Sequence, residues 1–225
     1  MKKSFLLVFL LVFGILIFGC GKKAGDTSGA KDDKTESKKD SDLNENTGYT
    51  VKYDLKEEKG TAGVMDMALK GKRIKMGFDV TEGENKSKTQ MWFKNDMVYM
   101  LTEAAGQKMA MKMDAKESES EMKDFNPDMF DKDKLKAKLN DYTKDGTEDV
   151  IGYKCDVYKS KTTDEKIWIY KDMVMLKMTS AKTTMVAKEF NPSPKLSDSD
   201  FDPPKDVDFK DMKDLLKGLE NLKTQ

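Results

Sequence analysis

The sequence predicts an α+β fold built on one antiparallel β-sheet of about nine to eleven strands, with a short internal helix and a C-terminal amphipathic helix. Three observations predict it. From Tyr49 onward apolar residues alternate with polar ones, as in half-buried strands. These strands are short, and turn-forming residues separate them at regular intervals, which is typical of an antiparallel meander. Two segments show helical spacing instead of alternation.

The N-terminal segment has the features of a secretory signal peptide. A cationic start precedes an uninterrupted apolar run, residues 5–18, which is too short for a permanent membrane-spanning helix. The sequence "IFGC", residues 17–20, resembles the bacterial lipobox, whose cysteine receives diacylglycerol. Residues 1–19 are therefore predicted to be a lipoprotein signal peptide, and Cys20 the lipid attachment point. An ordinary signal peptide cut elsewhere and an uncleaved N-terminal anchor are the alternatives.

Residues 21–48 have the composition of a flexible tether. They contain no aromatic residue and one large aliphatic residue, Leu43. Such a segment cannot offset the entropy of ordering, so we expect it to be disordered. The predicted organisation is a signal peptide over 1–19, lipidated Cys20 with its tether over 20–48, and one β-rich domain over 49–225.

The first series of strands begins at the end of this tether. Alternation puts the large apolar side chains of each strand on one face, whereas two of the strands are apolar in both phases and are expected to be buried more fully. Turn-forming residues separate the strands. The predicted strands are 49–57, 64–70, 73–80, 89–95, 97–101 and 107–114.

A second series of strands follows a short helix. The helix is predicted within residues 128–146, with Gly146 as its stop. Beyond the last strand and a Pro-rich break, residues 206–223 show helical spacing, and we expect their apolar stripe to lie on the inner face of the sheet. The strands are predicted at 149–160, 165–172, 173–180 and 183–190. The apolar stripe consists of Phe209, Met212, Leu215, Leu216, Leu219 and Leu222.

Composition excludes several classes of function. Lysine plus arginine and aspartate plus glutamate number 41 each, so no net field supports nucleic-acid binding. The chain has no histidine, which excludes Ser-His, Cys-His and His-metal chemistry. Acylation of Cys20 would leave Cys155 without a disulfide partner, and its phase in the strand predicts a small buried side chain. We therefore expect no enzymatic activity, no metal and no cofactor.

Three segments carry a resemblance to a known group. They are "GKRIKMGFDV" (71–80), "IGYKCDVYKSKTTDEKIWIYKD" (151–172) and "FDPPKDVDFKDM" (201–212). Together with the lipobox and the meander, residues 49–212 resemble the LolA-like superfamily of bacterial envelope proteins, which includes lipoprotein carriers and LppX-type lipid-binding lipoproteins. The resemblance implies a strongly curved antiparallel sheet, an unclosed half-barrel that wraps helices and leaves an apolar cavity.

Methionine is the most unusual feature of the domain. Fifteen of the 17 methionines lie between Met65 and Met185, and several form Met-x-Met pairs, which line one face of a strand. Three interpretations remain open: an adaptable core, an apolar ligand cavity, or a soft-metal site for Cu(I). The candidate ligand-binding residues are Met65, Met67, Met76, Phe78, Met109, Met111, Met113 and Arg73.

Arg73 is included because it is the only arginine in the chain. Its planar guanidinium pairs with carboxylates or phosphates in ways that lysine cannot. One ordinary surface cation is the alternative interpretation of this residue.

The predicted function is that of a membrane-anchored envelope lipoprotein that binds or carries a lipid or acyl chain without catalysis. Its partners would be the membrane, through the anchor on Cys20, and the apolar ligand. Gly21 lacks the aspartate that retains many lipoproteins at the inner membrane, so the resemblance favours the outer membrane. The alternative is a structural or surface-exposed interaction lipoprotein with a filled core and no ligand.

Overall fold

The computed structural model describes Leu43 and residues 48–57, 62–82, 85–116, 130 and 132–215. All of these residues belong to one compact unit, residues 38–225. The predicted signal peptide, Cys20 and most of the predicted tether lie outside the described residues, and so does the predicted C-terminal helix beyond Leu215. Within the described ranges, no helix combines the length and the apolar character needed to span a membrane.

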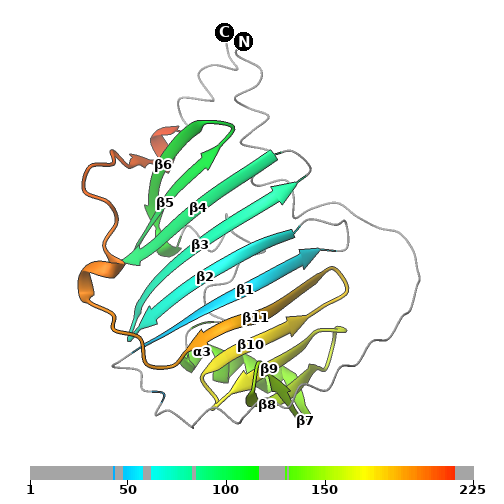
Figure 1. Ribbon diagram of the computed structural model, residues 1–225. Helices are drawn as coiled ribbons and strands as arrows, with labels where there is room; N and C mark the ends of the chain where they lie inside the picture. Colours follow the sequence, from blue (N-terminus) through cyan, green and yellow to red (C-terminus); the bar gives the residue numbers. More distant parts are fainter. Residues whose placement is uncertain are drawn as a thin grey trace. The chain divides into compact units, whose positions relative to one another are not determined.

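Twelve strands form a single open sheet, and its first half is an antiparallel meander. Each strand of this half pairs with the next along the chain, from the middle of the sheet to one edge (Figure 1). The strands are β1 (Tyr49–Glu57), β2 (Ala62–Lys70), β3 (Arg73–Glu82), β4 (Asn85–Lys94), β5 (Met97–Ala104) and β6 (Gln107–Asp114).

The second half is another antiparallel meander, preceded by a short helix. The helix α3 (Lys132–Lys138) continues into a 3-10 turn, η2 (Leu139–Asp141). The strands are β7 (Tyr142–Val150), β8 (Tyr153–Ser160), β9 (Lys166–Tyr170), β10 (Val174–Thr179) and β11 (Thr183–Asn191).

The two meanders join where the first strand pairs with the last. β1 pairs antiparallel with β11 in the middle of the sheet, so the strand order runs β12-β6-β5-β4-β3-β2-β1-β11-β10-β9-β8-β7. The two edge strands, β12 and β7, do not pair with each other, and the sheet stays open (Figure 1). The described structure is therefore mostly β, a large curved sheet with short helical segments.

The predicted alternation of buried and polar residues is confirmed along the first strands. In β1, Tyr49, Val51 and Tyr53 are buried, and the intervening residues are more exposed. Gly48 immediately precedes this strand with a φ of +75°, and a Cβ atom there would lie 2.2 Å from the carbonyl oxygen of Leu69. The glycine permits both the positive φ and the close approach of the two backbones.

One strand and one helix end differ from the prediction. Residues 142–148, expected as the end of the helix and a loop, form edge strand β7 together with residues 149–150. The strand predicted over 149–160 is therefore interrupted by a turn at Ile151 and Gly152, and β8 begins at Tyr153. Gly146, expected to stop the helix, lies inside that strand at a register shift between Lys144 and Thr147, with a φ of +109°. Seven successive residues of β7 are exposed, so the strand has no alternating pattern. With β7 and the two-residue strand β12, the sheet has twelve strands, whereas nine to eleven were predicted.

An aromatic cluster packs across the junction of the two meanders. Phe190 of β11 makes edge contacts with three tyrosines, with ring-centroid distances of 6.1 Å to Tyr49, 4.9 Å to Tyr153 and 5.7 Å to Tyr170. All four side chains are buried. Because aromatic edge contacts add about 0.5–1.5 kcal/mol each beyond area burial, this cluster ties strands that are far apart in sequence.

After β11, in the middle of the sheet, the chain crosses to the edge beside β6. It forms the short 3-10 helix η3 (Asp198–Phe201) and then β12 (Lys210–Asp211), which pairs in parallel with β6. Phe209, predicted to begin the apolar stripe of a helix, instead lies just before β12, and helical structure begins at Met212. The pairing with β6 holds this segment extended, so the helical spacing of Phe209 was misleading.

Candidate ligand-binding face

Five consecutive strands contribute one methionine each to a single line across the sheet. Directly paired residues of neighbouring antiparallel strands project from the same face. The register pairs the methionines one after another from β2 to β6. This methionine row consists of Met67, Met76, Met91, Met100 and Met111. We call the side of β1–β6 that bears it the methionine face, and the opposite side the outer face.

Further apolar residues border the row on the same face. Met65 pairs directly with Phe78, and Met113 pairs with Val98. Met109, two residues before Met111, pairs with Thr102. Beyond β2, the row continues through Val51 of β1. The structure thus brings all of the predicted methionines and Phe78 onto one continuous apolar face.

The side chains of the row are buried. Met76 is 0% exposed, Met67 and Met111 are each 2% exposed, and Met100, the most exposed of the row, reaches 6%. Side chains with so little accessible surface border no space large enough for a water molecule. A ligand on this face would therefore have to displace packed atoms, which unbranched, flexible thioether side chains allow more readily than branched ones.

Two members of the row, Met91 and Met100, are absent from the predicted set. Their strands are apolar in both phases: Trp92 and Met91 are both buried, although successive side chains point to opposite faces. Alternation therefore could not tell which side chain faced the row. The signal that finds them is the register of neighbouring strands, which follows from the positions of the hairpin turns.

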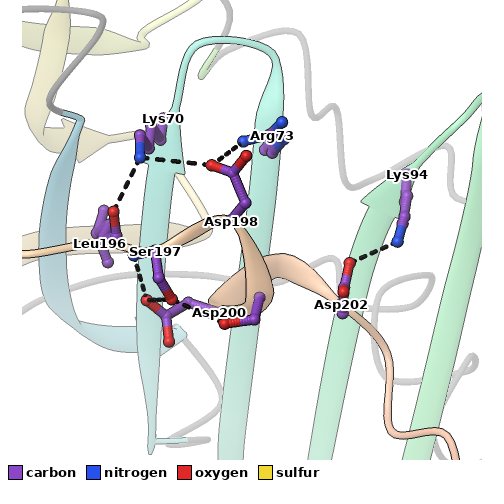
Figure 2. Close-up of polar contacts among 9 residues, drawn as sticks. Lys70, Arg73, Lys94, Leu196, Ser197, Asp198, Asp200 and Asp202 are labelled. Carbon is purple, nitrogen blue, oxygen red and sulfur yellow. Dashed lines mark hydrogen bonds and ion pairs between the residues drawn. The ribbon is translucent and has the colours of Figure 1, made fainter.

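Arg73 lies apart from the methionines. Ile74 and Met76 are on the methionine face, so Arg73, in the other phase, belongs to the outer face. Its guanidinium forms an ion pair with Asp198 of η3, and Lys70 joins the same carboxylate at 3.5 Å (Figure 2). The hydrogen bond from Arg73 holds the pKa of the Asp198 carboxyl below its usual range. In this structure Arg73 holds the C-terminal segment.

An open depression lies where β3 and β5 end and where β4 and β6 begin, and four of the charged side chains that line it form two ion pairs. Lys108 Nζ lies 2.7 Å from Glu103 Oε1, and Lys88 Nζ lies 3.9 Å from Asp79 Oδ1. Lysine and acid alternate along its wall, so it offers no field of one sign to a charged ligand. It is also lined by none of the predicted methionines.

The surroundings of Cys155 keep its thiol unreactive. Cys155 is buried and its thiol is free, as its strand phase predicted. Burial, the main cause, and the carboxylates of Asp149 and Asp156 raise the pKa of this thiol to about 12, which keeps it protonated and unreactive at neutral pH. Among the described residues, no group of three or more cysteine or acidic side chains could hold a metal ion.

Comparisons with known proteins found a weak structural similarity. No protein-family model matches the chain, and no curated protein matches it. Among solved structures, it is similar to a chain in the crystal structure of MucB in complex with MucA(peri), with a TM-score of 0.35 and 8% sequence identity. The match covers 70% of this chain and 54% of that chain, about half of its length. This likeness assigns the chain to no family.

Proposed function

We propose that this protein is a lipid-anchored envelope protein that binds a lipid or acyl chain on the methionine face without catalysing a reaction. The anchor is Cys20, and its acyl chains hold the domain at the membrane, with the outer membrane as the favoured location. The observation that carries the proposal is the methionine row, because five flexible thioether side chains in line form a long apolar strip that can adapt to acyl tails of different shape.

The proposed binding step is burial of a hydrocarbon tail along the row. Each methylene removed from water contributes about 0.8 kcal/mol, so a tail of several carbons offsets the cost of moving packed side chains. Phe78 and Met109, which are half-buried, mark the more accessible border of the face. No bond is made or broken in this step, and the ligand leaves as it entered.

A second candidate function is favoured by the burial itself. With 0–3% of their surfaces exposed, Met76, Met67 and Met113 pack like the interior of a filled core. A surface-exposed interaction lipoprotein, whose binding lies on another face, would have such a core. Under this alternative, methionine serves as an adaptable packing residue and no ligand is carried.

Lipid analysis of the purified protein separates the two functions. The Cys20→Ser chain, which cannot be acylated at that position, is purified and extracted with organic solvent, and the extract is analysed by mass spectrometry. About one extractable lipid per chain supports the ligand function. Absence of lipid from a folded preparation, even after incubation with vesicles of phosphatidylethanolamine and phosphatidylglycerol, contradicts it and favours the interaction protein.

A further inference from the structure

The segment after β11 forms a strap on the outer face of the sheet. We define the strap as residues 196–211. η3 lies beside β3 and β4, and β12 pairs with β6, so the strap crosses from the β2–β3 hairpin to the edge of the sheet (Figure 1). The strap carries six aspartates and two lysines, which makes it strongly acidic.

Basic side chains of the sheet hold the first part of the strap. Lys70 Nζ donates a hydrogen bond of 2.9 Å to the carbonyl oxygen of Leu196, and Arg73 pairs with Asp198 (Figure 2). Further along, Lys94 Nζ pairs with the carboxylate of Asp202 (Figure 2). The Arg73 and Lys94 side chains are 48% and 42% exposed, and exposed pairs contribute about 0–1 kcal/mol each. These ion pairs therefore favour an acidic segment over a basic one, but they contribute little to the free energy that holds the strap on the sheet.

Aromatic side chains hold the second part. The register places Trp92 of β4 beside Tyr99 of β5 on the outer face. Phe209 of the strap makes edge contacts with both rings, with centroid distances of 6.3 Å to Trp92 and 5.4 Å to Tyr99. Phe201, in η3, is 1% exposed. Phe209 thus brings the acidic strap into apolar contact with the sheet, and Phe201 is a second, buried aromatic side chain of the strap.

The contact leaves one buried group unsatisfied. Trp92 is 2% exposed, and its indole Nε1, which can donate a hydrogen bond, has no partner among the described residues. A buried donor without an acceptor costs about 1–3 kcal/mol. The strap therefore covers Trp92 without fulfilling its hydrogen bonding, and an occupant that brought an acceptor would fit this surface better.

We propose that the outer face of β3–β6 is a docking surface for an extended, acidic, phenylalanine-bearing segment of another protein, and that the strap is its internal occupant. The sheet supplies a basic rim at Lys70, Arg73 and Lys94, an aromatic floor at Trp92 and Tyr99, and a strand edge at β6. Addition of a segment to a strand edge is an established mode of peptide recognition, and β12 uses that mode over two residues. The strap masks the surface until a competing segment displaces it.

A labelled peptide tests the proposal on the full chain purified in detergent. The probe is a synthetic peptide with the sequence of residues 196–211, followed by fluorescence anisotropy. A strap-loosened variant, Asp198→Asn with Phe209→Ala, is expected to bind the peptide about ten-fold more tightly than the unchanged chain, because the surface is then more often free. No difference between the two folded chains contradicts the proposal.

Charge reversal tests the specificity of the surface. In the strap-loosened chain, Arg73→Glu with Lys94→Glu is expected to weaken peptide binding at least about ten-fold. A peptide carrying Asp198→Lys and Asp202→Lys should restore binding to this variant. Lys154→Glu with Lys159→Glu, two exposed lysines of β8 in the other half of the sheet, is the matched control and should leave binding unchanged. Binding indifferent to the Arg73 and Lys94 reversal overturns the proposal, and so does a strap-loosened chain that forms a dimer instead of binding the peptide.

Hydrogen exchange provides a test that needs no variant. In the unchanged chain, the strap amides should exchange through local opening, faster than those of β3 and β4, and faster still in high salt, which screens the exposed ion pairs. If the strap amides exchange only when the amides of β3 and β4 do, the strap never detaches by itself in the folded protein, and this result would contradict the proposal. Because the docking surface lies on the outer face, these results are independent of whether the methionine face binds a lipid.

Discussion

Met76 lies within the methionine row, between Met67 on β2 and Met91 on β4. Because it is 0% exposed, Met76→Ala should lower the free energy of unfolding by roughly 2–5 kcal/mol in urea denaturation. Met76→Leu, which conserves volume, should cost less than about 1.5 kcal/mol. A neutral effect of Met76→Ala would show that the packing around the row is loose, contrary to the structure.

Cys155 makes stability depend on alkaline pH. Its thiol donates to the carbonyl oxygen of Tyr153, and burial raises its pKa to about 12 from an ordinary value of 9.0. Between these values the unfolded chain has lost the proton and the folded chain retains it, so stability should fall as pH rises through this window. Urea denaturation at a series of pH values should show a shallower fall for Cys155→Ala. An unchanged slope in that variant would assign the effect to other buried groups, such as Tyr53.

At the scale of the element, strands in which apolar and polar side chains alternate could be predicted from the sequence. A strand made almost entirely of exposed residues could not. β6 was predicted over 107–114 and has those bounds, because Met109, Met111 and Met113 alternate with smaller or charged residues. Residues 142–148 of β7 were missed because the exposed residues of this strand carry no periodic signal. Alternation along β3 puts Arg73 in the opposite phase to Ile74 and Met76, so the sequence alone separates Arg73 from the methionine face.

The strap is an element whose attachment should depend on acidic pH. The ion pair with Arg73 holds the pKa of the Asp198 carboxyl below its ordinary value. The pair therefore stabilises the attached strap fully at any pH above the ordinary pKa of an aspartate. This stabilisation is lost as the pH falls through the lowered pKa of Asp198. The protection factors of the amides of residues 196–211, which correct for the slower intrinsic exchange in acid, should therefore fall before those of β3 as the pH is lowered. Asp198→Asn should remove this part of the pH dependence. A strap equally protected at neutral and acidic pH would contradict the role of the pair.

At the scale of the whole molecule, the partnership of β1 with β11 was beyond prediction. The two strands pair across more than a hundred residues of sequence, and no local pattern specifies which strands of two meanders meet. The methionine row depends on the same kind of information: the Met-x-Met pairs predicted which face each strand presents, but the line across five strands follows from the register. An open sheet with one apolar face was therefore predictable, and the arrangement of its site was not.

Anchoring is a prediction about the whole chain in the cell. If Cys20 is the lipidated residue, metabolic labelling with a radioactive fatty acid should mark the protein, and Cys20→Ser should abolish the label and release the protein from the membrane fraction. Cys155→Ser is the matched control, because its buried thiol should contribute nothing to labelling. Undiminished label in Cys20→Ser would show that the lipobox interpretation is wrong.

Photo-crosslinking tests most directly whether the methionine face binds an apolar ligand. The Cys20→Ser chain is incubated with a fatty acid that carries a diazirine in its tail, irradiated, digested and mapped by mass spectrometry. We predict cross-links in the peptides that bear Met67, Met76 and Met91, suppressed by excess unlabelled fatty acid. Cross-links confined to the outer face, or unaffected by the competitor, would contradict the proposed function.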